Sequence, residues 1–231
     1  MRDEQPVLAA ALRHSIGAGA VFLLFLGLVM FLPAGDIRWA KGWLMIVVFV
    51  ALTVPSVVYM WRANPQIFPA RSRIHEGTKG WDKALLIVLL PLLLAIYPVA
   101  ALDDGRFHWS RVPVWLVVVG YVLFIGSWWL IMWVEKVNRF AEPGVRVHAG
   151  QHVIDSGPYA IVRHPMYMAT VPFAVGTALA LGSYWALVPA ALVIPVLVAR
   201  TVMEDRTLRE ELTGYKAYAG RVRYRLFPGV W

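Results

Sequence analysis

The sequence predicts an all-α integral membrane protein with about six transmembrane helices, the last two forming a tight helical hairpin and both termini lying in the cytoplasm. Three observations predict this fold class. Of the 231 residues, 59% are hydrophobic and only 16% are charged, which is far more apolar than a soluble domain of this size requires. Uncharged runs are long enough to cross a bilayer, and lysine and arginine are concentrated in alternate loops.

Four uncharged runs predict one spanning helix each, because roughly 17 to 25 mostly apolar residues cross the hydrocarbon. These runs are Ser15 to Gly35, Gly42 to Trp61, Ala84 to Leu102 and Val112 to Val134. Tryptophans stand near several of their ends, as in an interfacial belt. The first run is too long for the core of a signal peptide, so we expect it to remain as a span.

The last uncharged run, from Pro165 to Ala199, has 35 residues. This length is too great for one span and just enough for two. Gly182-Ser183 is the only plausible break, so the run predicts an antiparallel hairpin with short arms. A re-entrant hairpin is the alternative, and either version returns the chain to the side it left.

The 22 lysines and arginines predict the orientation of the helices. If the spans alternate, 18 of them fall on one side of the bilayer and four on the other. The richer side is then cytoplasmic, and it holds both termini, the loop from 135 to 164 and the tail from 200 to 231. The net charge of +8 therefore indicates membrane orientation and no nucleic-acid partner. The absence of cysteine excludes disulfides, thiolate catalysis and cysteine metal sites.

The stretch GPYAIVRHPMY, residues 157–167, stands at the cytoplasmic start of the hairpin. Its Gly-Pro pair indicates a turn, and Pro165 suits the first turn of a helix. Arg163 and His164 therefore precede a membrane helix whose first N–H groups have no partner within the helix. Such a place can hold the anionic or polar part of a ligand. Alternatively, Arg163 is an interfacial anchor and His164 a capping residue.

Arg200 and Glu204 follow the hairpin at its other end and share one helix face, because they are four residues apart. Taken alone, this spacing predicts an ion pair between the two. A carboxylate so close to hydrocarbon is costly unless it is paired or hydrated. The turn at Gly182-Ser183 brings the pair near His164 and Tyr167, so we expect a cluster of polar and aromatic groups at one depth.

The tail from 212 to 231 mixes aromatic and basic residues. This composition is typical of a segment that lies on an anionic lipid surface. The same segment could be a lid over the cytoplasmic cluster, and the two roles are compatible.

Together, VNRF, VRVHAGQHVIDSGPYAIVRHPMY, the Arg and Glu four apart and the tail VRYRLFPGVW resemble the isoprenylcysteine carboxyl methyltransferase family and its prokaryotic relatives. These are integral-membrane enzymes that use S-adenosylmethionine. The resemblance extends roughly from Asn138 to the C-terminus and is weaker in NPQIF and GTKGWDK. It implies that residues 112–231 form the methyltransferase core and that residues 1–111 supply three N-terminal helices with their loops.

The resemblance also implies the roles of individual residues. Glu204 would bind the cofactor, Arg200 would face the acceptor, and these two would carry the catalysis. His148 stands where the family often has glutamine, so its contact with the cofactor is left open. The nucleotide part of the cofactor would lie against Gln151, His152, Val153 and Ile154, largely through backbone groups. The rest of the cofactor would be surrounded by Tyr159, His164, Pro165, Met166 and Tyr167.

The chemistry of methyl transfer agrees with these roles. The site has to align donor and nucleophile and exclude water, so no metal is required. We expect an apolar or membrane-associated acceptor, with a carboxylate like that of isoprenylcysteine as the first choice, because an ionised carboxylate needs no general base. Small thiols, amines, fatty carboxylates and phospholipid head groups are the alternatives. Arg200 could hold a carboxylate by two hydrogen bonds. The chain would then be a multi-pass membrane enzyme, in the inner membrane if it is bacterial, with its site facing the cytoplasm.

Two alternatives belong to other functional classes. Membrane reductases of the sterol-reductase type carry a similar RHP segment and use a nicotinamide cofactor, but their chains are usually much longer. A noncatalytic membrane scaffold or small carrier is the second alternative. The predicted spans contain no charged residue, and this disfavours a transport path.

Overall fold

The structure is a computed structural model that describes residues 4–71, 74 and 76–231, with side chains from residue 17 onward. Every regular element of the described residues is helical. The elements are α1 (Glu4–Ala34), α2 (Ala40–Ala63), α3 (Ile67–Arg71), α4 (Gly80–Ala100), η1 (Ala101–Phe107), α5 (Val114–Val137), η2 (Gly157–Ala160), α6 (Pro165–Ala180), α7 (Leu187–Glu211) and α8 (Tyr215–Arg221).

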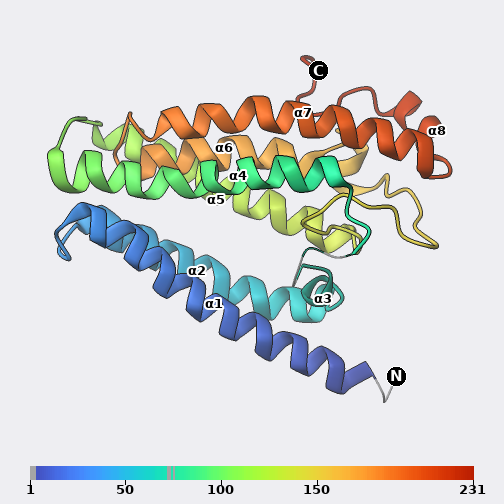
Figure 1. Cartoon of the computed structure of the whole chain (residues 1–231), viewed down its shortest axis with the longest axis horizontal. Helices are drawn as coiled ribbons and strands as arrows, with labels where there is room; N and C mark the ends of the chain where they lie inside the picture. Colours follow the sequence, from blue (N-terminus) through green and yellow to red (C-terminus); the bar gives the residue numbers. More distant parts are fainter. Residues whose placement is uncertain (1–3, 72–73, 75) are drawn as a thin grey trace.

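The long helices run side by side along one axis (Figure 1). α4, α5, α6 and α7 form a compact group, and α1 and α2 lie along one side of it. One buried core joins α1, α2, α4, α5, α6 and the start of α7. The N-terminal helices therefore pack directly against the part of the chain that carries the motifs.

The predicted all-α membrane fold is confirmed. Among the described residues, five helical segments are long and apolar enough to cross a membrane: Gly17–Ala34, Ala40–Ala63, Gly80–Phe107, Val114–Val137 and Leu187–Glu211. The sixth apolar helix, α6, has only 16 residues. At 1.5 Å per residue it is about 24 Å long, shorter than the roughly 30 Å of a hydrocarbon core.

The predicted hairpin is present as α6 and α7, which pack against each other. The chain reverses near Gly182, whose φ of 78° is readily adopted only by glycine. α7 extends to Glu211, beyond the apolar run that ends at Ala199. Arg200 and Glu204 are therefore held on the same rigid helix that crosses the membrane.

At the far end of the bundle, α4 continues through the π-helical segment η1 beyond its apolar run. The fully buried Asp103 accepts hydrogen bonds from the Ser110 N–H and hydroxyl and from the Ser183 hydroxyl. These bonds supply the donors that a buried carboxylate needs. They also tie α4 to the turn between α6 and α7.

α5 and α6 approach each other closely through glycines. A Cβ added at Gly120 would lie 2.8 Å from the Leu179 carbonyl carbon and nearer still to the Ala180 nitrogen. A Cβ added at Gly176 would lie 2.7 Å from the Phe124 nitrogen. Small residues of this kind allow helix backbones to meet inside a membrane.

Replacing Gly120 with alanine is expected to destabilise the protein by about 1–3 kcal/mol, because the added methyl group overpacks the α5–α6 contact. Gly126→Ala is the matched control, since a Cβ at this position of the same helix meets nothing within 4 Å. Thermal unfolding in detergent should show a lower melting temperature for Gly120→Ala alone. Equal melting temperatures for the two variants would contradict the close contact.

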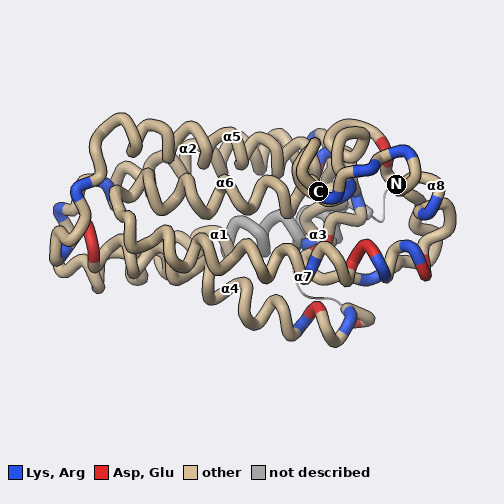
Figure 2. Tube along the Cα trace, turned by 90° about the horizontal axis from the view of Figure 1, so that it is seen from above, with Lys and Arg blue, Asp and Glu red and all other residues tan. Residues whose placement is uncertain are grey.

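Charged residues are gathered at the two ends of the bundle, and the helices between them are almost uncharged (Figure 2). Most of the coloured lysines and arginines lie at the end that holds α8 and the last turns of α7. The other end holds the pair of Lys41 and Asp104, whose charged atoms are 2.5 Å apart. This distribution agrees with the sequence, in which most lysines and arginines fall in the loops of one side of the bilayer.

Candidate active site

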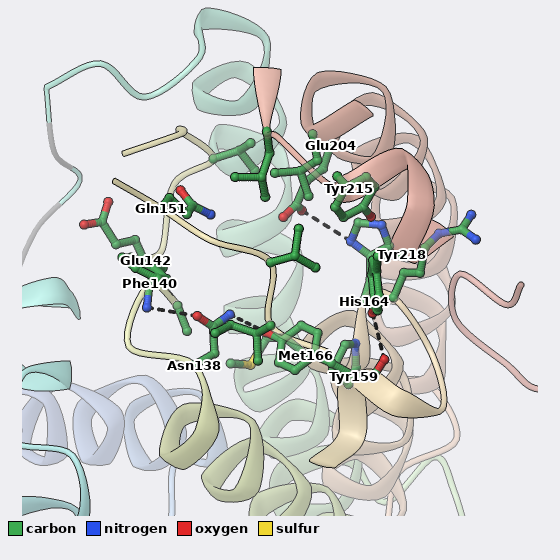
Figure 3. Close-up of a pocket in the computed structure, with 18 of the residues that line it drawn as sticks. Asn138, Phe140, Glu142, Gln151, Tyr159, His164, Met166, Glu204, Tyr215 and Tyr218 are labelled. Carbon is green, nitrogen blue, oxygen red and sulfur yellow. Dashed lines mark hydrogen bonds and ion pairs between the residues drawn. The ribbon is translucent and has the colours of Figure 1, made fainter. Parts of the chain in front are cut away.

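A cavity lies at the α8 end of the bundle, where the loop after α5 meets the start of α6 and the end of α7 (Figure 3). Its empty space, including the open mouth, is about 870 Å³. The sequence-predicted residues that line it are Gln151, His152, Val153, Ile154, Tyr159, His164, Pro165, Met166, Tyr167 and Glu204.

His164 is buried at the wall of this cavity between two carboxylates. Its Nδ1 lies 3.7 Å from Glu204 Oε2, and its Nε2 lies 3.6 Å from Asp205 Oδ1. Burial by itself would lower the pKa of His164, but the nearby Asp205 and Glu204 outweigh burial and raise that pKa. The convergence expected from the hairpin is therefore present, and it favours an imidazolium between two acids.

Glu204 presents its carboxylate to the cavity and is held from both sides. The Tyr167 hydroxyl donates a hydrogen bond to Glu204 Oε2, and the Tyr167 ring stacks on His164 with an interplanar angle of 3°. The side chain of Glu204 is 21% exposed. A carboxylate fixed in this way can accept hydrogen bonds from an ammonium group or a hydroxyl of a ligand.

Arg163 does not line a membrane interface as an anchor, because it is buried and paired. Its Nε donates to Asp205 Oδ1 at 2.8 Å, and its Nη1 donates to the carbonyls of Val222 and Arg223. Asp205 also accepts a hydrogen bond from the Tyr215 hydroxyl at 3.0 Å. Arg163 and Asp205 thus join the hairpin to the C-terminal tail.

Carbonyl groups of the tail also accept hydrogen bonds from the backbone just before α6. The Arg163 N–H donates to the Tyr224 carbonyl at 3.0 Å, and the His164 N–H donates to the Arg225 carbonyl at 2.9 Å. These two groups are therefore not available to an anion. The start of α6 contributes side chains to the cavity, and the tail accepts hydrogen bonds from the N–H groups of the two residues that precede the helix.

The tail forms one wall of the cavity, as expected for the lid. Tyr215 and Tyr218 line the cavity on the side of Glu204 and His164 (Figure 3). The Tyr218 hydroxyl donates to the carbonyl of Tyr159 at 2.8 Å and so closes the tail onto the GPY turn. Aromatic faces of this kind suit an onium group or a purine ring.

Arg200 lies beside the site and does not line the cavity. Its Nε and Nη2 donate to the fully buried Asp82 of α4 at 2.7 and 3.1 Å. Nη2 also donates to the Pro143 carbonyl, and the guanidinium lies 5.0 Å from the centre of the Tyr167 ring. The spacing alone predicts an ion pair between Arg200 and Glu204. This prediction is wrong, because Arg200 pairs with Asp82 instead.

The loop that carries Gln151 forms the opposite wall of the cavity. The side-chain oxygen of Gln151 accepts a hydrogen bond from the His148 N–H at 2.9 Å. His148 is not a lining residue of the cavity. Its Nε2 lies 3.4 Å from Glu142 Oε1. This contact places His148 behind the wall, on the side of Glu142.

Several lining residues were not predicted individually. The sequence motif VNRF contains Asn138 and Phe140, and both line the cavity beside Glu142 (Figure 3). Leu208 and Leu212 line it from the end of α7. Leu208 stands four residues after Glu204 and Leu212 eight residues after it, and this spacing is the signal that could have found them, because residues four apart share a helix face.

The residues present fit an S-adenosyl ligand. The cavity offers one fixed carboxylate for an ammonium group, aromatic side chains for the adenine and the sulfonium, and the lining segment 151–154 for the nucleotide part. A carboxylate suits the ammonium end of an S-adenosyl ligand, and aromatic side chains suit its sulfonium and its adenine.

Comparison with known proteins supports this chemistry. A family model described as phospholipid methyltransferase (PEMT) matches residues 115–213. The matched range contains α5 except its first residue, the cavity loop, the α6–α7 hairpin and Glu204. A search of curated proteins found no match to this chain. Residues 115–213 therefore carry the signature of the phospholipid methyltransferase family, in the same clan of membrane methyltransferases as the isoprenylcysteine carboxyl methyltransferases.

Proposed function

We propose that this protein transfers a methyl group from S-adenosylmethionine to a membrane-associated acceptor at the cytoplasmic face. One observation carries the proposal: a cavity walled by His164, Tyr167 and Glu204 lies at the end of a membrane-spanning bundle, inside the range that matches a methyltransferase family. The concentration of lysine and arginine at this end supports a cytoplasmic orientation (Figure 2).

When bound, S-adenosylmethionine supplies a sulfonium methyl group, to which the acceptor's lone pair bonds while the C–S electron pair returns to sulfur. Glu204 would hold the ammonium group or a ribose hydroxyl. Backbone groups at 151–154 would meet the nucleotide part. The faces of Tyr215 and Tyr218 would attract the cation, and the tail that carries them would exclude water.

Arg200 can contribute less to the acceptor than a free guanidinium could. Asp82 occupies its Nε and Nη2, so the two-point grip on a carboxylate that the sequence predicts would have to displace this buried pair. Of the three guanidinium nitrogens of Arg200, only Nη1 has no hydrogen-bond partner among the described residues. The proposal therefore rests on a lipid-like acceptor, which the family description also supports, and treats an apolar carboxylate as the alternative.

Calorimetry on the detergent-purified chain tests the cofactor assignment. We expect S-adenosylhomocysteine to bind with a dissociation constant in about the micromolar range, because a small site with a few charged contacts supplies roughly 8 kcal/mol. NADPH serves as the comparison ligand for the reductase alternative. Binding of NADPH without binding of S-adenosylhomocysteine would overturn the proposed function.

A further inference from the structure

Asp205, near the end of α7, is shared by three arginines. Its carboxylate accepts hydrogen bonds from the Nε atoms of Arg163, Arg209 and Arg225 at 2.8, 3.0 and 3.3 Å. The Tyr215 hydroxyl donates to it as well, so the acceptor sites of this carboxylate are filled. One acid thus faces three guanidinium groups, and this group of four charged residues, the Asp205 cluster, carries a surplus of positive charge.

Arg209 and Arg225 are the members of the Asp205 cluster that reach the surface. Their side chains are 39% and 32% exposed, whereas the side chain of Arg163 is 4% exposed. Among the described residues, neither Arg209 nor Arg225 has an acidic partner other than Asp205. Both Nε atoms contact the same oxygen, Asp205 Oδ2, so the two guanidinium groups are close enough to bind one phosphate together.

The position of Arg209 along α7 places it at the depth of lipid headgroups. Just before α7, Trp185 is 56% exposed and packs edge-on against Trp109, as is typical of the far interface. α7 begins at Leu187, and a hydrocarbon core of roughly 30 Å corresponds to about 20 helical residues at 1.5 Å each. The near boundary of the hydrocarbon then falls close to Thr207, and Arg209 lies just beyond it.

The face of α7 that leads to Arg209 is apolar and exposed. Val202 and Val198 stand seven and eleven residues before Arg209, so the three side chains share one helix face. The two valines are 45% and 37% exposed. In a bilayer, an acyl chain can therefore lie along these valines while its phosphate reaches Arg209.

The tail supplies the other side of the site. The Arg225 guanidinium lies 5.0 Å from the centre of the Trp231 ring. Trp231 packs against the buried cluster that joins α4, α6 and α7, and Leu226 of the tail belongs to this cluster. The end of the tail thus lies beside α7 (Figure 1). An indole between apolar side chains and a cation is typical of an anchor at a membrane interface.

From this geometry we infer that Arg209 and Arg225 bind the phosphate of an anionic phospholipid whose acyl chains lie along α7. Charge complementarity favours this occupant, because the Asp205 cluster has surplus positive charge and its one acid is already occupied. The phosphate supplies the missing negative charge and so fastens the tail that closes the cavity. Neither arginine lines the cofactor cavity, so this lipid is a partner of the tail and is distinct from the methyl acceptor.

Equilibrium binding of radiolabelled dioleoylphosphatidylglycerol to the full chain in mixed micelles tests the inference. Arg209→Gln should weaken binding about fivefold, which is the contribution of one arginine near an anionic lipid. Arg206→Gln is the matched control on the same helix, since Arg206 is 79% exposed and pairs with Glu210. This control should bind the lipid like the wild type. Equal affinities of the two variants would overturn the inference.

Two further probes test the headgroup and the chains. Dioleoylphosphatidylcholine has the same chains and a phosphate but no net charge, so it should bind the wild type about fivefold more weakly. Equal affinity for the two lipids would show that only the apolar surface is recognised and would overturn the inference. Glycerol 3-phosphate, which has no chains, should not displace the lipid. Complete displacement by it would indicate a soluble phosphate ligand and would overturn the assignment to a lipid.

Thermal unfolding separates a lipid site from a purely structural role of Arg209. Dioleoylphosphatidylglycerol should raise the melting temperature of the wild type more than that of Arg209→Gln, because a ligand of the folded state stabilises it. Without the lipid the two should melt alike, since Asp205 keeps Arg163, Tyr215 and Arg225 as donors. If Arg209→Gln melts lower by the same amount in both media, Arg209 only fastens the tail and the inference fails. None of these measurements uses S-adenosylhomocysteine, so their outcome is independent of the proposed function.

Discussion

Glu204→Gln is expected to reduce the affinity for S-adenosylhomocysteine about 10- to 100-fold and to abolish methyl transfer at micromolar cofactor concentrations. The physical reason is that a charge-assisted hydrogen bond is worth about 1.5–3 kcal/mol, and glutamine keeps the shape of the side chain while removing its charge. Glu204 is the carboxylate that the Tyr167 hydroxyl and the His164 ring hold toward the cavity. Calorimetry measures the loss directly.

Glu210→Gln is the control for this substitution. Glu210 lies on the same helix, but its side chain is 59% exposed and pairs with Arg206 on the surface. We expect this variant to bind S-adenosylhomocysteine like the wild type, because surface pairs contribute little. If Glu204→Gln and Glu210→Gln bind equally well, Glu204 is not a cofactor residue and the proposed site is misplaced.

The second large effect is expected at the buried pair of Asp82 and Arg200. Asp82→Asn should destabilise the protein by about 3–5 kcal/mol, because it leaves the Arg200 charge buried without its partner. The asparagine can still accept the hydrogen bond that the Val145 N–H donates to Asp82 at 2.7 Å. The loss of stability therefore measures the ion pair of Asp82 and Arg200, and not the hydrogen bond by which Asp82 holds the loop at Val145. Thermal unfolding in detergent measures it.

The double variant Asp82→Asn with Arg200→Met should regain most of the lost stability, because it removes both buried charges at once. Asp155→Asn serves as the surface control, since Asp155 pairs with Arg221 and both side chains are more than half exposed. A double variant no more stable than Asp82→Asn would contradict the role of the pair. The double variant also shows whether acceptor methylation needs Arg200 while cofactor binding persists.

The membrane fold could be predicted from the sequence because hydropathy alone decides it. Backbone groups in hydrocarbon must be paired, so each long apolar run forms a helix whatever its neighbours are. The turn at Gly182 could also be predicted, because Gly182-Ser183 divides the run from Pro165 to Ala199 into two arms of nearly equal length. Helix ends were less predictable, because α7 continues into charged sequence once tertiary partners satisfy Arg200 and Asp205.

Much of the candidate site could also be predicted, since the motif residues from Gln151 to Tyr167 lie close in sequence and the hairpin brings Glu204 to them. The carboxylate that pairs with Arg200 could not be predicted. Asp82 lies 118 residues before Arg200, and no spacing rule connects the two. The i,i+4 rule favoured Glu204 instead, and it failed because a fully buried carboxylate needs a cation more than a partly exposed one does.

The sequence by itself thus determined that this chain has membrane-spanning helices, that its polar residues gather at one end, and which motif lines the cavity there. Only the tertiary structure decided which charges are paired, that the tail closes the cavity, and that Arg163, Arg209 and Arg225 share the carboxylate of Asp205. The physical reason is range. Hydropathy and helix periodicity act within one segment, whereas the pairing of buried charges and the shape of cavities depend on how separate helices pack.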